Sequence, residues 1–157
     1  MAERFALESV LDYKQKMEDL REQEMAQAQI RVREAEHYLA VLTEKLQGQY
    51  VALRRLQIAA PLDVSALQWT EIYLVRLESE IDSQRALLHG FRAELQASRE
   101  RLLEATKERK AIEKLKERWL AEVEARNRRA EQIATDETAT VRFNRARQAQ
   151  RLSGGQA

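Results

Sequence analysis

A single proline, Pro61, interrupts a chain of 157 residues in which apolar residues otherwise recur at heptad spacing. Proline lacks a backbone N–H, and its ring collides with the preceding turn, so it cannot continue a helix. The residue before it is also pushed out of the helical region. The sequence therefore predicts two long helices, with the chain folding back between them at Pro61.

This pattern predicts an all-α fold, a long antiparallel two-helix coiled-coil hairpin with a longer C-terminal helix. Asp63 or Ser65 can cap the second helix, because a side-chain oxygen can accept a bond from a free N–H of the first turn. We expect one domain over residues 1–157, made of a helix over about 4–57, a turn over about 58–65, a helix over about 66–147 and a frayed tail over 148–157.

The composition agrees with a helical rod and narrows the function classes. Charged residues make up 34% of the chain, with 27 Lys and Arg against 26 Asp and Glu, and there are only 4 Gly. A multi-stranded fold needs a turn about every 8–12 residues, so this scarcity of turn formers excludes it. Cysteine is absent, which rules out disulfides. No apolar run approaches the roughly 20 residues that cross a bilayer, so we expect a cytoplasmic protein without direct membrane insertion.

Two apolar stripes can be traced in the first arm. The longer one predicts a helix face from Ala28 to Leu56, with Gln49 as its one polar member. A second stripe is offset from the first by a stutter, an irregularity that locally unwinds a supercoil. Its members are Val10, Tyr13, Met17, Leu20 and Glu24.

The second arm has one stripe, from Leu74 to Ile133, and its polar interruptions crowd toward the far end. The first arm has about 53 residues and spans roughly 80 Å at 1.5 Å per residue. Folded back on Pro61, the second arm reaches the end of its partner near residue 118. We therefore expect some 25–30 residues, around Trp119 to Arg147, to project as a single helix.

Dimerisation is the main alternative to the hairpin. The same stripes could pair two chains in parallel. A connector of a few residues gives an effective concentration of millimolar order, which favours pairing within one chain. We therefore expect a monomer in isolation.

Nothing in the sequence points to catalysis or to a cofactor. The two histidines, His37 and His89, are too few for a metal centre of fixed geometry, and we interpret them as surface residues. No phosphate-binding G-x-x-x-x-G-K-[ST] loop is present. The letters LSGGQ at 152–156 match an ATPase signature, but no helix follows them in the sequence, and we interpret the match as coincidence. We expect no enzyme activity, no cofactor and no metal.

Seven arginines between Arg126 and Arg151 make the far end basic. Such a cluster could bind phosphates non-specifically. The whole chain carries only +1, however, and Phe143 is the single aromatic residue in the cluster. An acidic protein surface fits the cluster equally well, and we expect no nucleic-acid partner.

Three motifs resemble the flagellar FliJ family, in the family's order and spacing. The opening RFALESVLDYK at 4–14 resembles the family's start, IEKLKER at 112–118 resembles its E-K-x-K/R-E stretch, and DETATVRF at 136–143 resembles its D-E-x-A-x-x-R/K-F ending. Together they cover nearly the whole chain.

The resemblance implies a function that composition cannot. It implies a non-enzymatic stalk of the flagellar type III export apparatus, whose terminal end inserts into the hexameric export ATPase ring and promotes its activity. It also implies contacts with the export-gate membrane protein and with substrate chaperones, and peripheral association with the inner membrane through that apparatus. The equivalent stalk of a virulence type III secretion system and a generic coiled-coil adaptor remain alternatives.

The resemblance also suggests contact residues. Leu42 and Leu77 fall on the stripes and are explained equally well as coiled-coil core, whereas Tyr38 and Tyr73 lie just off them. Two residues at the edge of this site, Lys45 and Glu80, depart from the family pattern. The gate-binding candidates are Tyr38, Leu42, Tyr50, Tyr73, Leu77 and Gln84. The candidates for binding the ATPase ring are Val10, Tyr13, Arg126, Arg128 and Arg129.

Overall fold

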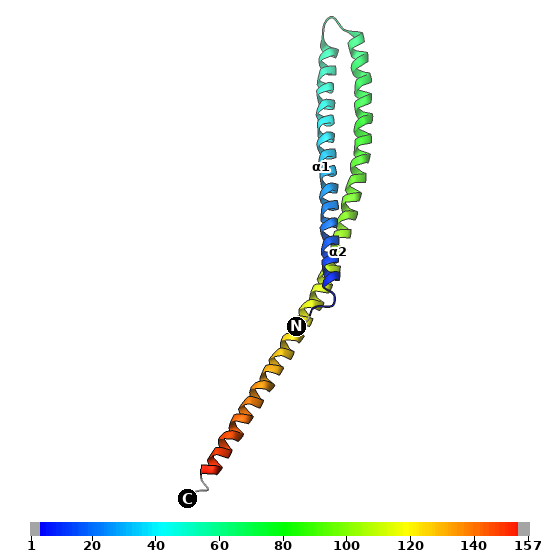
Figure 1. The fold of residues 1–157 in the computed structure, drawn as a ribbon. Coiled ribbons are helices and arrows are strands. Elements are labelled where there is room, and N and C mark those ends of the chain that lie inside the picture. The colour runs from blue at the N-terminus through cyan, green and yellow to red at the C-terminus, as the bar shows by residue number, and fades with distance from the viewer. Residues whose placement is uncertain (1–3, 154–157) are drawn as a thin grey trace. The chain divides into compact units, whose positions relative to one another are not determined.

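A computed structural model describes residues 4–153 of the chain, and it contains two helices (Figure 1). Helix α1 runs over Glu8–Ile58 and has 51 residues, and helix α2 runs over Val64–Ser153 and has 90. The structure is 94% helical, and the described residues contain no strand. This confirms the all-α hairpin with a longer second helix.

The turn forms where the proline predicts it. Helix α1 ends three residues before Pro61, and the Ala60–Pro61 peptide bond is cis. The Ala66 amide donates to Asp63 Oδ1 at 3.0 Å, so Asp63 is the N-cap of α2. At the outer ends the helices differ from the expected bounds, because α1 begins at Glu8 and α2 continues to Ser153.

The chain divides into two compact parts, which we describe separately. The hairpin part comprises Tyr13–Arg109. The terminal part combines the N-terminal segment up to Asp12 with the chain from Lys110 onward. Whether the chain behaves as one domain stays a prediction.

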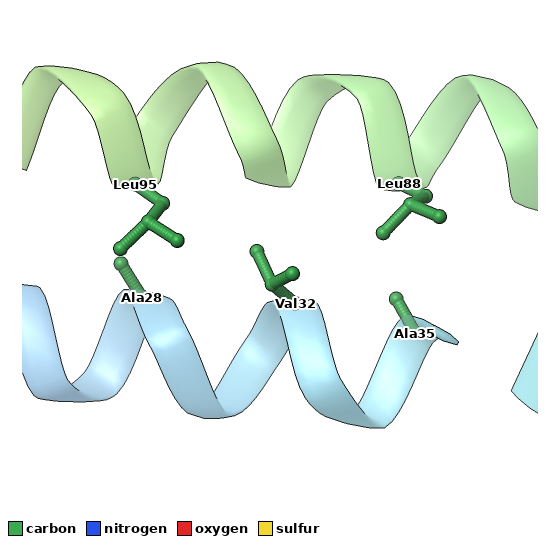
Figure 2. Packing of buried hydrophobic residues seen from close by; sticks show 5 residues of the cluster. All are labelled: Ala28, Val32, Ala35, Leu88 and Leu95. Atoms are coloured by element: carbon green, nitrogen blue, oxygen red, sulfur yellow. The ribbon is translucent and has the colours of Figure 1, made fainter. Parts of the chain in front are cut away.

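Small residues of α1 face large residues of α2 in the apolar core of the hairpin part. Ala28, Val32 and Ala35 lie opposite Leu88 and Leu95, and all five are buried (Figure 2). Alternating small and large side chains across a seam lets facing layers fill the space between two helices. A second cluster nearer the turn joins Leu42, Leu77 and Ile81. These contacts confirm the stripe that starts at Ala28 and the part of the α2 stripe from Leu74 to Leu95. The last members of the α2 stripe, Arg126, Ala130 and Ile133, are exposed.

The expected stripe at the start of α1 is wrong at three of its five positions, although Met17 and Glu24 are half-buried. Val10, Tyr13 and Leu20 are exposed, and the first buried side chain is Leu11. Counting heptads from Leu11 places one unbroken series of buried or half-buried residues along the helix, with no stutter. The series is Leu11, Lys14, Glu18, Arg21, Met25, Ala28, Val32, Ala35, Leu39, Leu42, Leu46, Gln49, Leu53 and Leu56.

Charged side chains occupy the seam between α1 and α2 at the end of the hairpin part away from the turn. Lys14 Nζ lies 2.6 Å from Glu108 Oε2, and Glu18 is paired with Arg109. The Thr106 hydroxyl donates to Glu18 Oε1 at 2.8 Å. Reading apolar residues alone missed this register, because core positions here hold ion pairs rather than hydrocarbon.

Within the terminal part, the N-terminal segment contacts α2 over a short stretch. The rings of Phe5 and Trp119 lie 5.6 Å apart, centroid to centroid, and Lys116 Nζ donates to Glu8 Oε1 at 2.7 Å. Val123 is the last half-buried side chain of α2, and every residue from 124 to 151 is exposed. Among the described residues, neither helix is long and apolar enough to cross a membrane.

Candidate functional site

The hairpin part offers surfaces rather than a catalytic cleft. Four of its grooves run along the line where α1 and α2 meet, and another lies on α1 alone close to the turn. No group of three or more metal-ligating side chains comes together among residues 4–153, and both histidines are exposed. The candidate site is therefore built from the side chains that flank the coiled-coil seam.

Tyr38 flanks the seam and is held in place by the opposite helix. Its ring is 43% exposed, and its hydroxyl donates to Glu80 Oε1 at 2.5 Å. Because the bonded neutral phenol is favoured beside a carboxylate, the Glu80 interaction raises the pKa of Tyr38 above its ordinary value. Glu80, a departure from the family pattern, is thus the residue that orients this tyrosine.

Tyr73 shares a flank with Tyr38. It precedes Glu80 by seven residues, which is two helical turns, so both project from the same face of α2. Its ring is 40% exposed. An accessible groove on this flank is lined by Tyr38, Gln84, Leu87 and Phe91, together with Arg31, Glu34 and Ala35.

Gln84 connects the flank to the core. It stands at a core position of the heptad, is half-buried, and its Nε2 donates to the carbonyl of Ala35 at 3.4 Å. One side chain thereby spans the seam and lines the groove beside Tyr38. The structure therefore brings together Tyr38 and Gln84, with Tyr73 two turns from Glu80 on the same face.

Leu42 and Leu77 belong to the core. Each is only 2% exposed, and they pack against each other in the cluster near the turn. A partner cannot reach these side chains while the hairpin stays closed. They hold the two helices together beneath the exposed flank, and their burial agrees with the core positions that the stripes predicted.

Tyr50 lies on the other flank of the seam. It follows Tyr38 by twelve residues, a rotation of about 120° at 3.6 residues per turn. Its hydroxyl donates to Glu78, which raises the pKa of Tyr50 above its ordinary value. Glu78 precedes Glu80 by two residues, so the two carboxylates point from well-separated faces of α2. The structure does not place Tyr50 on one surface with Tyr38.

The residues expected to face the ATPase ring are all exposed. In the hairpin part Tyr13 is accessible, and in the terminal part Val10 is at the edge of exposure. Three arginines occupy the section of α2 that buries no side chain, and Arg128 forms an ion pair with Glu124 at 2.6 Å. These arginines are Arg126, Arg128 and Arg129.

Sequence reasoning missed the two carboxylates that hold the tyrosines and the ion pairs in the seam. Heptad counting from Leu11 would have placed Glu18 at a core position of α1, where it can face Arg109 in the stripe of α2 that starts at Leu74. Cross-helix tyrosine–glutamate pairs have no such signal, since they depend on how the two helices are staggered.

Comparison with known proteins identifies the family. Neither a search of curated proteins nor a search of solved structures finds a match. A protein-family model described as the flagellar FliJ protein matches residues 3–148, which is nearly the whole chain. The chain therefore belongs to the flagellar FliJ family, whose members are non-catalytic components of the flagellar export apparatus.

Proposed function

We propose that this chain is the stalk that couples the flagellar export ATPase to the rest of the export apparatus. Its terminal end inserts into the hexameric ring and promotes ATP hydrolysis by that partner. The hairpin links the ring to the export-gate membrane protein and to substrate chaperones. In isolation the chain is a monomer, and in the cell it lies at the cytoplasmic side of the inner membrane, held there by the apparatus.

The observation that supports this proposal most strongly is the solvated section of α2. Every side chain from 124 to 151 is exposed, although the section is helical. An isolated helix is only marginally stable in water, and most helical stability in proteins comes from packing. A long exposed helix is therefore suited to acquire its packing from a partner such as the inside of a ring.

The gate-facing surface is best assigned to the flank that carries Tyr38 and Tyr73. Both rings are accessible, and aromatic side chains that are partly exposed and already oriented lose little conformational entropy on binding. Leu42 and Leu77 maintain the spacing of the helices beneath this flank. Tyr50 faces another direction and is not included in this surface.

Hexamer formation by the cognate export ATPase tests the ring contact. Analytical ultracentrifugation of the ATPase with the purified chain should show a saturable rise in the hexamer fraction. Replacing Arg126, Arg128 and Arg129 with glutamine should remove that rise. The matched control replaces three exposed arginines of the hairpin part, Arg33, Arg76 and Arg99, with glutamine, which changes the net charge equally and should leave the rise intact.

Gate binding needs a separate measurement. We expect Tyr38→Ala combined with Tyr73→Ala to weaken binding to the cytoplasmic domain of the gate protein while preserving ATPase hexamer formation. Tyr13→Ala should do the reverse. Equal loss of both interactions in both variants would contradict the assignment of two separate surfaces.

A further inference from the structure

A groove on α1 close to the turn lies outside the surfaces that we assign to the gate and to the ring. It is lined by Tyr50, Val51, Arg54, Arg55 and Ile58 and has a volume of about 390 Å³. Val51 and Ile58 are seven residues apart at the outward position of the heptad, so they form one apolar line on the face that turns away from α2. Both are exposed, Ile58 to 80%.

The charge of this groove is unbalanced. Its lining contains two guanidinium groups and no carboxylate. Four other grooves along the hairpin each contain at least one glutamate beside their basic residues. The sequence shows the same bias, because no Asp or Glu occurs from Lys45 to Leu62.

The Glu78 carboxylate of α2 is already hydrogen-bonded within the chain. Glu78 accepts the Tyr50 hydroxyl and is not part of the groove lining. The bond fixes the tyrosine ring at one wall of the groove. Such an arrangement gives a preformed apolar line with two cations beside it, and a ligand would not have to displace an intramolecular ion pair to reach them.

We propose that this groove binds an acidic amphipathic helix of a partner protein. Apolar side chains of that helix cover Val51 and Ile58, and its carboxylates pair with Arg54 and Arg55. Amphipathic helices dock through anchors at i, i+3, i+4 and i+7, a spacing that matches the two-turn separation of the apolar residues. Arginine forks bind carboxylates through two parallel hydrogen bonds, which favours acidic ligands of defined orientation.

A designed peptide provides the probe. It is a fluorescein-labelled 15-residue helical peptide with leucines on one face and glutamates on both sides of them. Fluorescence anisotropy with the full chain should show saturable binding. A peptide of the same composition with scrambled order, and one with lysine in place of each glutamate, should bind at least about tenfold more weakly.

Matched variants locate the binding site. Arg54→Gln with Arg55→Gln should weaken the peptide at least about tenfold, whereas Arg142→Gln with Arg145→Gln should change affinity less than about twofold. Val51→Ser should likewise weaken it, and Val75→Ser, at an exposed valine of α2, should not. Circular dichroism confirms that each variant keeps its helix content.

Three outcomes would overturn the proposal. The first is no saturable binding of the designed peptide up to about 1 mM. The second is equal weakening by the groove variants and their controls. The third is binding to phosphatidylglycerol vesicles that depends on Arg54 and Arg55 and that the peptide does not displace, since that result would assign the groove to an anionic lipid surface. The outcome does not depend on whether the chain stimulates an ATPase.

Discussion

The Glu18 carboxylate of α1 is paired with the Arg109 guanidinium of α2 inside the seam, and the two side chains are only 12% and 19% exposed. Both residues stand where a coiled coil normally places hydrocarbon. Thr106 supplies a further hydrogen bond to the same carboxylate. The pair thus fixes the register between α1 and α2 in a stretch of the seam that lacks large apolar side chains.

Breaking this pair should cost stability. Glu18→Ala removes the carboxylate that is paired with the largely buried Arg109 guanidinium, and we expect a loss of about 2 kcal/mol in the free energy of unfolding. Urea titration followed by circular dichroism measures it. Glu124→Ala removes an exposed pair and should cost less than about 0.5 kcal/mol. A double variant with leucine at both seam positions should recover most of the loss, and a cost for it as large as that of Glu18→Ala would contradict this account.

Each buried side chain of the apolar core near the turn should contribute more to the free energy of unfolding than the Glu18–Arg109 pair does. Leu77→Ala removes a side chain that is 2% exposed, and we expect a loss of about 2–3 kcal/mol. The control is Val75→Ala, two residues away and exposed, which should change stability by about 0.5 kcal/mol or less. Similar losses for the two variants in urea would show that Leu77 is not in the core.

Tyr38 and Tyr50, whose hydroxyls are hydrogen-bonded to glutamates, should deprotonate at a higher pH than an ordinary tyrosine. Because Glu80 and Glu78 accept their hydroxyl protons, the pKa values of Tyr38 and Tyr50 lie above the ordinary value of about 10. The stability that these bonds supply is fully present below about pH 10 and is lost as the pH rises through the raised values. Ring carbon shifts of the four tyrosines, followed by NMR against pH, report each one separately.

Two glutamine substitutions serve as controls for each other. Glu80→Gln should lower the pKa of Tyr38 toward its ordinary value and leave Tyr50 unchanged. Glu78→Gln should have the converse effect. Persistence of a raised pKa of Tyr38 in Glu80→Gln would show that another group causes it.

The contact between Phe5 and Trp119 should be visible in fluorescence. In a Trp69→Phe background, Trp119 is the sole tryptophan. Phe5→Ala should then shift its emission to longer wavelength, because the indole loses its aromatic neighbour and gains water. Phe143→Ala removes an exposed ring of the same helix and should leave the spectrum unchanged; a shift of similar size in both variants would contradict the contact.

The sequence predicted the fold well wherever apolar residues set the heptad. Pro61 marked the turn, Asp63 was one of two proposed caps, and the stripe through Leu42 matched the buried face. It failed at the start of α1, where Val10 and Tyr13 suggested a stripe that proved exposed. Ion pairs at core positions carry no hydrophobic signal, so only the partner helix reveals them.

The candidate surfaces were less predictable than the fold. Tyr38 and Tyr73 were expected beside the seam, and both are accessible there. Tyr50 was grouped with them because it matched the family pattern, yet its position in the heptad places it on the other flank. Assigning a residue to a flank requires the register of the helix, and a motif match alone does not supply it.

ATP turnover by the cognate export ATPase tests the stalk proposal most directly. The full chain and a chain that ends at residue 123 are titrated into the ATPase, and both should show the same Trp119 emission if the paired section is intact. We predict that the full chain raises turnover to a plateau and that the shortened chain does not. Equal stimulation by both chains, or no stimulation by the full chain at saturation, would contradict the account.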